Sequence, residues 1–211
     1  MPQAKERLFE IHVKAESKAS RGIARVLEND DAWVLCHTEI GSSQELMWTK
    51  HLSRVDAAAV ATQQLARRIL RSNELVQIEL EEVLLAGGFG ERIDVLRRPA
   101  HFAIDSTSFT EFRCQETAPF EAHIYTRARE PRSLKAIEVT TLMRRSQVAA
   151  AYLTCFPDQS EISLTFHFGT WEELEERLAP LCLEIKAALG AGFELRIVAE
   201  HCLLSLRPKM P

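Results

Sequence analysis

The sequence predicts an α+β protein in which mostly antiparallel sheet packs against two main helices. Hydrophobic residues make up 46% of the 211 residues and charged residues 27%, which is typical of a folded globular chain. Two segments repeat apolar residues every three or four positions, as amphipathic helices do. Most other apolar segments alternate with polar residues at period two and follow one another without helices between them, which favours antiparallel strands.

Strands are expected along most of the chain. Segments 23–27 and 33–38 flank the turn residues Asn29, Asp30 and Asp31, so we expect a hairpin there. The same alternation of apolar and polar residues predicts further strands at 9–13, 46–50, 82–86, 101–105, 111–115, 120–127, 136–143, 148–156, 162–168, 193–199 and 202–206.

Two helices are expected. The first covers 53–71, and the second begins at Thr170, forms a capping box with Glu173 and ends before Gly190. Pro180 lies inside the second helix and should kink or divide it. The apolar stripes consist of Val55, Ala58, Thr62, Leu65 and Ile69 in the first helix, and of Leu174, Leu178, Leu181, Ile185 and Leu189 in the second.

The order of the predicted elements is repeated once along the chain. Several strands, a helix and a strand are followed by several strands, a helix and two strands, which suggests a duplicated α+β unit. We place the junction near Arg98 and Pro99, so that 1–98 and 99–211 form either two domains or one continuous domain. No repeat of individual residues is recognisable, and the expected duplication therefore depends on element order alone.

Composition also limits the location and the partners. The five cysteines are an odd number, widely spaced and set in apolar runs, so we expect reduced, buried thiols in a cytoplasmic protein of bacterial type. No apolar stretch approaches the roughly 20 residues of a membrane-spanning helix, and the N-terminus has no signal-peptide core. The net charge of −4 argues against nucleic acid as the main partner and favours another protein or self-association.

A glycine cluster follows the predicted strand at 82–86. Together with the helix before it, the run Val83-Leu-Leu-Ala-Gly-Gly-Phe-Gly90 resembles the adenosine-side loop of the actin-like ATPase and sugar kinase superfamily. The phosphate-binding hairpin and the second phosphate loop of that superfamily are absent, and so are the two common glycine-rich phosphate loops. We therefore expect Gly87, Gly88 and Gly90 to form a tight connection with positive φ angles.

Histidines on strands provide the candidate site. Alternation places His123, Tyr125 and Arg127 on one face of a strand, with Arg129 just beyond it, and places His167 opposite the apolar residues of its own strand. If the strands are neighbours, this face could bind an anion through His123, Arg127 and Arg129, or a metal ion through neutral imidazoles. The simpler expectation is that the histidines lie apart on ordinary solvated faces.

Other candidate groups are weaker. His101 also opposes apolar neighbours on a predicted strand, and the carboxylate pair Glu81 and Glu82 is expected at a solvated strand edge. No Gly-x-Ser-x-Gly elbow or clearly reactive cysteine is present. The sequence thus names His123, Tyr125, Arg127, Arg129 and His167 as ligand-binding residues and assigns no metal ligand, catalytic residue or cofactor.

These observations favour a non-enzymatic interaction, assembly or adaptor protein that presents a sheet face or edge to its partner. Trp48 and Tyr125 are expected to be exposed and could anchor such an interface. The alternative is a small enzyme or binder of an anionic, phosphorylated small molecule that uses the histidine and arginine face.

Overall fold

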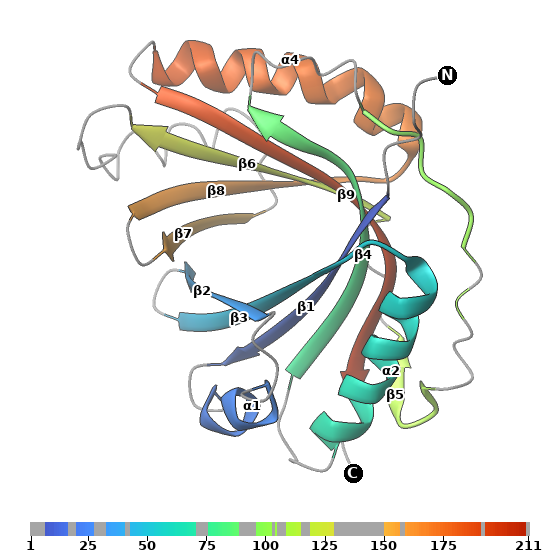
Figure 1. The fold of residues 1–211 in the computed structure, drawn as a ribbon. Helices are drawn as coiled ribbons and strands as arrows, with labels where there is room; N and C mark the ends of the chain where they lie inside the picture. The colour runs from blue at the N-terminus through green and yellow to red at the C-terminus, as the bar shows by residue number, and fades with distance from the viewer. Residues whose placement is uncertain are drawn as a thin grey trace. The chain divides into compact units, whose positions relative to one another are not determined.

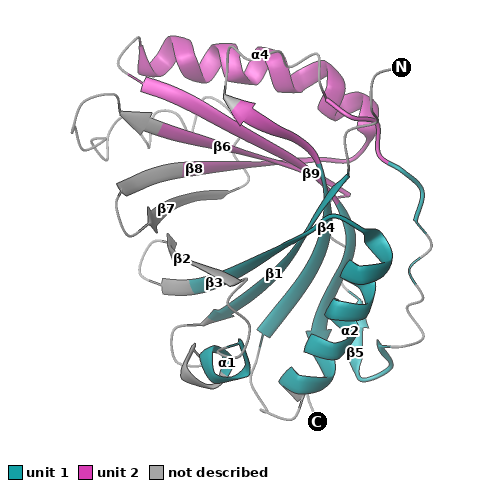
Figure 2. Cartoon of the chain, in the orientation of Figure 1, with its two compact units in different colours: residues 1–83, 100–117, 202–211 teal, residues 84–99, 118–201 magenta. Residues whose placement is uncertain are grey.

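The computed structural model confirms the α+β class, because each strand pair with a described register is antiparallel and two main helices pack on the strands (Figure 1). Two compact units, coloured separately in Figure 2, are described in turn: unit 1 comprises Met1–Val83, Ala100–Thr117 and Cys202–Pro211, and unit 2 comprises Leu84–Pro99 and Ala118–His201. The structure describes residues 7–16, 20–27, 33–40, 43–70, 76–88, 96–102, 104, 109–114, 119–128, 150–156, 159–190 and 193–209.

Unit 1 has the strand order β4-β1-β3-β2. With a helix after the first strand and another after the third, this is the order of the ferredoxin-like split β-α-β fold. The short strand β5 (Phe112–Cys114) pairs with the end of β9 (Phe193–Pro208). The other elements are β1 (Leu8–Glu16), α1 (Ser20–Leu27), β2 (Trp33–Ile40), β3 (Ser43–Leu52), α2 (Val55–Leu70) and β4 (Val76–Gly88).

The core of unit 1 lies between the strands and the two helices. The predicted stripe of α2 is confirmed, because Ala58, Thr62, Leu65 and Ile69 are buried while Arg67 and Arg68 are exposed. Apolar side chains from the strands, from α1 and from residues 109–112 complete this core, among them Phe9, Ile11, Val13, Ile23, Ile78, Leu80, Phe109, Phe112 and Leu206.

Unit 2 repeats the strand order of unit 1. Its strands β6 (Phe120–Ala128), β7 (Ala150–Phe156), β8 (Gln159–Phe168) and β9 lie in the order β9-β6-β8-β7, which again places the last strand beside the first and the third beside the second. The helix α4 (Trp171–Leu189) connects β8 to β9, as α2 connects β3 to β4. The repetition suggested by element order is thus matched by a repeated strand order, whereas the division into 1–98 and 99–211, as two domains or one continuous domain, stays a prediction.

The long helix α4 begins and ends as predicted. Thr170 accepts a hydrogen bond from the backbone N–H of Glu173 at 3.1 Å, and the carboxylate of Glu173 accepts one from the backbone N–H of Gly169 at 2.8 Å. Gly190 ends the helix with a φ angle of 81°, which favours glycine. Pro180 lies within a continuous helix and does not divide it. Four of the five predicted stripe residues are buried, namely Leu174, Leu178, Leu181 and Ile185.

Several local predictions are wrong. Residues 23–27 belong to helix α1 and form no hairpin, because Ile23 and Leu27, four residues apart, lie on one buried face. His101, Phe102 and Ile104 lie outside any strand, and the two C-terminal strands are one, β9. Trp48 is buried, so it is not an exposed interface anchor.

The glycine and cysteine predictions need correction as well. Gly87 and Gly88 end strand β4, and Gly190 is the glycine with a positive φ angle among the described residues. Cys182 is buried as expected, but Cys114 is exposed and Cys202 is half-buried. The Asn29–Asp31 turn, Gly90, Arg129 and the strand predicted at 136–143 lie outside the described residues. Within the described part of the chain, no helix is long and apolar enough to cross a membrane.

Candidate functional site

The polar face of the unit 1 sheet gathers histidine and glutamate side chains from three strands. Strand alternation puts Glu10 and His12 of β1 on the face opposite the apolar core residues of the same strand. The register pairs Glu10 with His51 of β3 on one side and with Glu81 of β4 on the other, and it pairs His12 with Thr49 of β3. We call Glu10, His12, His51 and Glu81 cluster 1.

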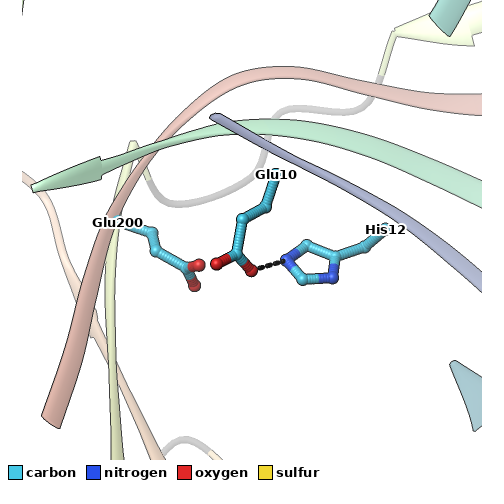
Figure 3. Close-up of side chains that lie close together, drawn as sticks. All are labelled: Glu10, His12 and Glu200. Carbon is cyan, nitrogen blue, oxygen red and sulfur yellow. Dashed lines mark ion pairs between the residues drawn. The ribbon is translucent and has the colours of Figure 1, made fainter. Parts of the chain in front are cut away.

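The side chains of cluster 1 contact one another in series, from Glu81 through His12 and Glu10 to His51. The Nε2 atom of His12 lies 3.0 Å from Oε2 of Glu81 and 3.3 Å from Oε2 of Glu10, the contact drawn in Figure 3. The other carboxylate oxygen of Glu10 lies 3.0 Å from Nε2 of His51. On the far side of the His12 ring, Nδ1 lies 2.9 Å from the hydroxyl of Thr49. Both nitrogens of His12 are therefore held by side chains of neighbouring strands.

Unit 2 carries a matching arrangement, which we call cluster 2: Glu121, His123, His167 and Glu200. The register pairs Glu121 with His167 on β8 and with Glu200 on β9, and it pairs His123 with Thr165. The Nε2 atom of His123 lies 3.0 Å from Oε2 of Glu200 and 3.7 Å from Oε2 of Glu121. His167 contacts Oε1 of Glu121 at 3.4 Å, and Nδ1 of His123 lies 2.9 Å from the hydroxyl of Thr165.

The two clusters correspond atom by atom. In each unit the first strand supplies Glu and His, the third strand supplies Thr and His, and the last strand supplies Glu, and the same oxygen and nitrogen atoms face each other. Burial also agrees, because the last-strand glutamates Glu81 and Glu200 are each 2% exposed while the third-strand histidines His51 and His167 are 49% and 47% exposed. This correspondence is a repeat of individual residues, which the sequence analysis did not recognise.

The structure brings most of the predicted site residues together. His123, Tyr125 and His167 share one face of the β6–β8 pair, so the simpler expectation that the histidines lie apart is wrong. The backbone of Arg127 extends strand β6 beyond Tyr125, whereas Arg129 lies outside the described residues. Whether this set binds an anionic ligand stays a prediction.

Sequence reasoning missed the remaining members: Glu10, His12, Thr49, His51, Glu81, Glu121, Thr165 and Glu200. Glu81 was expected at a solvated edge, but it is buried in the middle of β4, and so is Glu82 on the opposite face. A signal was present in the sequence. Phe-Glu-x-His occurs at residues 9–12 and 120–123, and Thr-x-His occurs at 49–51 and 165–167, each pair at the same place in the two units.

The charges in each cluster need a counterion. A buried carboxylate is stable only when it is paired, and the Nε2 atom of the first-strand histidine faces two carboxylates at once. That nitrogen must therefore carry a proton or bind a cation. Donor atoms bound to one zinc-sized ion at roughly 2.0–2.2 Å lie roughly 3.0–3.5 Å apart, and most of the contacts between imidazole nitrogen and carboxylate oxygen fall in this range pair by pair, as ordinary hydrogen bonds also do.

The contact between Nδ1 and the threonine hydroxyl fits a bound cation well. A histidine that binds a metal ion through Nε2 usually donates its Nδ1–H to an oxygen, which fixes the tautomer and the ring orientation. The hydroxyls of Thr49 and Thr165 lie at hydrogen-bonding distance from that nitrogen in both units. Imidazole with carboxylate is a donor set that suits divalent transition metal ions.

The surroundings of the clusters differ at two positions. Glu79 of β4 lies opposite His12 in unit 1, whereas Val198 lies opposite His123 in unit 2. Glu79 forms an ion pair with Lys14, and Tyr125 takes the place of this lysine in unit 2. Burial opposes the ionised form of Glu79, but Lys14, His12 and Gln77 outweigh this effect and hold the pKa of its carboxyl below the ordinary value.

Comparisons with known proteins give no functional assignment. No protein-family model matches the sequence, and no curated protein matches it. A solved structure described as an unknown protein from Galdieria sulphuraria is 11% identical, with 94% of this chain and 99% of that chain covered and a TM-score of 0.27. Aspartate kinase from Synechocystis is 12% identical, with 92% of this chain and 43% of that chain covered and a TM-score of 0.24. These similarities are too low to support an argument.

Proposed function

We propose that the protein binds divalent transition metal ions, one at cluster 1 and one at cluster 2. The observation that carries the proposal is the duplication of one arrangement of two imidazoles, two carboxylates and a hydroxyl in two units. Structural needs alone do not require the same five side chains at corresponding places of the two units. A shared ligand chemistry accounts for them.

The expected ions follow from the donors. Imidazole nitrogen favours Zn²⁺, Fe²⁺, Ni²⁺ or Cu²⁺ over Mg²⁺ and Ca²⁺, which prefer sites made only of oxygen. The carboxylates of Glu121 and Glu200 also make the predicted histidine face acidic, which favours a cation over the anionic ligand suggested by the sequence. The role in interaction or assembly, with a protein partner or a second copy, remains a separate proposal, as does the cytoplasmic location.

Calorimetric titration of chelator-treated protein with Zn²⁺ tests the proposal. We expect one ion per cluster, and we expect Mg²⁺ at the same concentration to produce no comparable heat. Saturating Zn²⁺ should also raise the melting temperature, since an ion at 100 times its dissociation constant adds about 2.7 kcal/mol to the free energy of unfolding.

Matched variants connect binding to the clusters. His51→Ala and His167→Ala each remove a half-exposed imidazole, so they should leave the fold intact and each abolish Zn²⁺ binding at one site. The double variant should lose both. Zn²⁺ binding that survives in the double variant, or wild-type protein that binds no transition metal, would mean that the clusters are networks of protonated histidine and glutamate.

A further inference from the structure

We infer that the two metal sites are unequal and that cluster 1 binds a divalent transition metal ion more tightly than cluster 2. The inference rests on the proposed function and concerns the relative strength of the two sites. The two units differ at the positions that border the clusters, although the cluster residues themselves are the same.

The first difference lies directly across from the central histidine of each cluster, which is His12 in cluster 1 and His123 in cluster 2. Glu79 faces His12 between β4 and β1, whereas Val198 occupies the same place facing His123 between β9 and β6. Side chains directly opposite in an antiparallel pair have Cβ atoms about 4.5–5.5 Å apart. Cluster 1 therefore has an additional buried carboxylate within reach of the ion, and cluster 2 has an uncharged side chain there.

The second difference lies one step further along the same strands. Lys14 and Gln77 form this pair in unit 1, and Tyr125 and Arg196 form it in unit 2. The guanidinium of Arg196 lies 4.1 Å from the centre of the Tyr125 ring. Arg196 is exposed, so solvent screens its charge, and the difference in charge between the two clusters rests on the buried carboxylate of Glu79.

The positive charges near cluster 1 do not reverse this order. Lys14 is bound to the carboxylate of Glu79 and is about a third exposed, so solvent screens its charge more than that of the buried carboxylate. Arg207 donates a hydrogen bond to Gln77 at 2.8 Å, but this arginine is exposed. Cluster 1 is also tighter, with contacts of 3.3 and 3.0 Å from Glu10 to its two histidines, against 3.7 and 3.4 Å from Glu121.

Zn²⁺ titrations of the two single-histidine variants compare the sites. His167→Ala leaves cluster 1 intact and His51→Ala leaves cluster 2 intact, and the two removed side chains are almost equally exposed. A charge difference of this kind should make the remaining site of His167→Ala stronger by roughly tenfold. Equal affinities, or a stronger site in His51→Ala, would overturn the inference. If neither variant nor the wild type binds Zn²⁺, the proposed function itself has failed.

Two further changes in the His167→Ala protein test the cause and should act in opposite directions. Glu79→Gln removes the carboxylate with little change of shape and should weaken Zn²⁺ binding, whereas Lys14→Gln leaves that carboxylate uncompensated and should strengthen it. Glu82→Gln is the matched control, because Glu82 is equally buried on the same strand but on the opposite face. Unchanged affinity in folded Lys14→Gln protein, or an equal loss in the Glu82→Gln control, would contradict the charge argument.

Discussion

Replacing the hydroxyl behind each central histidine should weaken metal binding without changing any atom that contacts the ion. In the double variant Thr49→Val, Thr165→Val, the methyl group that replaces each hydroxyl has nearly the same size but cannot form the 2.9 Å contact with Nδ1. Loss of such a supporting partner typically costs 10–100-fold in metal affinity. We therefore expect the dissociation constant for Zn²⁺ to rise by about that factor at each site.

The same change should lower stability in the absence of metal. Thr49, Thr165 and His12 are buried and His123 is half-buried, so each variant leaves a largely desolvated imidazole nitrogen without its hydroxyl. An unsatisfied buried polar group costs about 1–3 kcal/mol, and chemical denaturation of chelator-treated protein should show a loss of this size per site. Calorimetry with Zn²⁺ and denaturant titration without it thus measure two separate consequences of one substitution.

Two controls separate positioning from packing. Thr→Ser at both places keeps the hydroxyl and should restore most of the Zn²⁺ affinity, even though it removes a buried methyl group. Thr62→Val alters an equally buried threonine whose hydroxyl donates to the carbonyl of Ala58 inside α2, and it should leave Zn²⁺ binding unchanged. Wild-type affinity in the double valine variant would refute the role assigned to these hydroxyls.

Three further predictions concern the fold. Leu178→Asp should unfold or aggregate the protein because it places a carboxylate in the unit 2 core at a cost of several kcal/mol, whereas Leu183→Asp on the exposed side of α4 should leave the melting temperature unchanged in a circular dichroism melt. Burial raises the pKa of the Cys182 thiol to about 12, so a thiol reagent near pH 8 should modify the exposed Cys114 and leave Cys182 unreacted until the protein unfolds. The backbone N–H and the arginine that bind the carboxylate of Glu173 lower its pKa, so its contribution to stability is complete above the ordinary carboxyl range and is lost as the pH falls through the lowered value. Glu173→Gln should therefore flatten the acid side of the stability profile, and an unchanged profile would contradict this assignment.

The sequence predicted the long helices well because their apolar stripes continue over several turns. The stripe of α4 contains five apolar positions, and a capping residue and a glycine mark its ends. Helix α1 has eight residues, and Ile23 and Leu27 are consistent with a strand as well as with one helical turn. Packing of Ile23 and Leu27 against the rest of unit 1 selects the helix over the strand, and local sequence does not encode that packing.

Two of the four residues of cluster 2 followed from strand parity. Alternation alone placed His123 and His167 on the polar sides of their strands, and that placement is confirmed. Their proximity depends on β6 and β8 being neighbours, which is a property of the fold. Glu200 could not be assigned at all, because it comes from a third strand that follows α4 in the chain.

The repeat of individual residues is present in the sequence, but by itself it is weak evidence for a duplication. Phe-Glu-x-His and Thr-x-His each match at only a few positions, and short matches of common residues occur by chance in a chain of this length. The register changes their significance, since both repeats lie at corresponding places of two units with the same strand order. Topology therefore had to be known before the sequence similarity could be recognised.

Every donor atom of the two clusters lies on a strand, and none comes from a loop. Ladder hydrogen bonds on both sides hold β1 and β6, so the backbone fixes where each donor side chain starts and limits how far the donors can spread. Ca²⁺ takes six to eight oxygen ligands at about 2.3–2.6 Å, so the two imidazole nitrogens of each cluster suit it poorly. In the proposed metal sites, the sheet would therefore favour a small ion over a larger one.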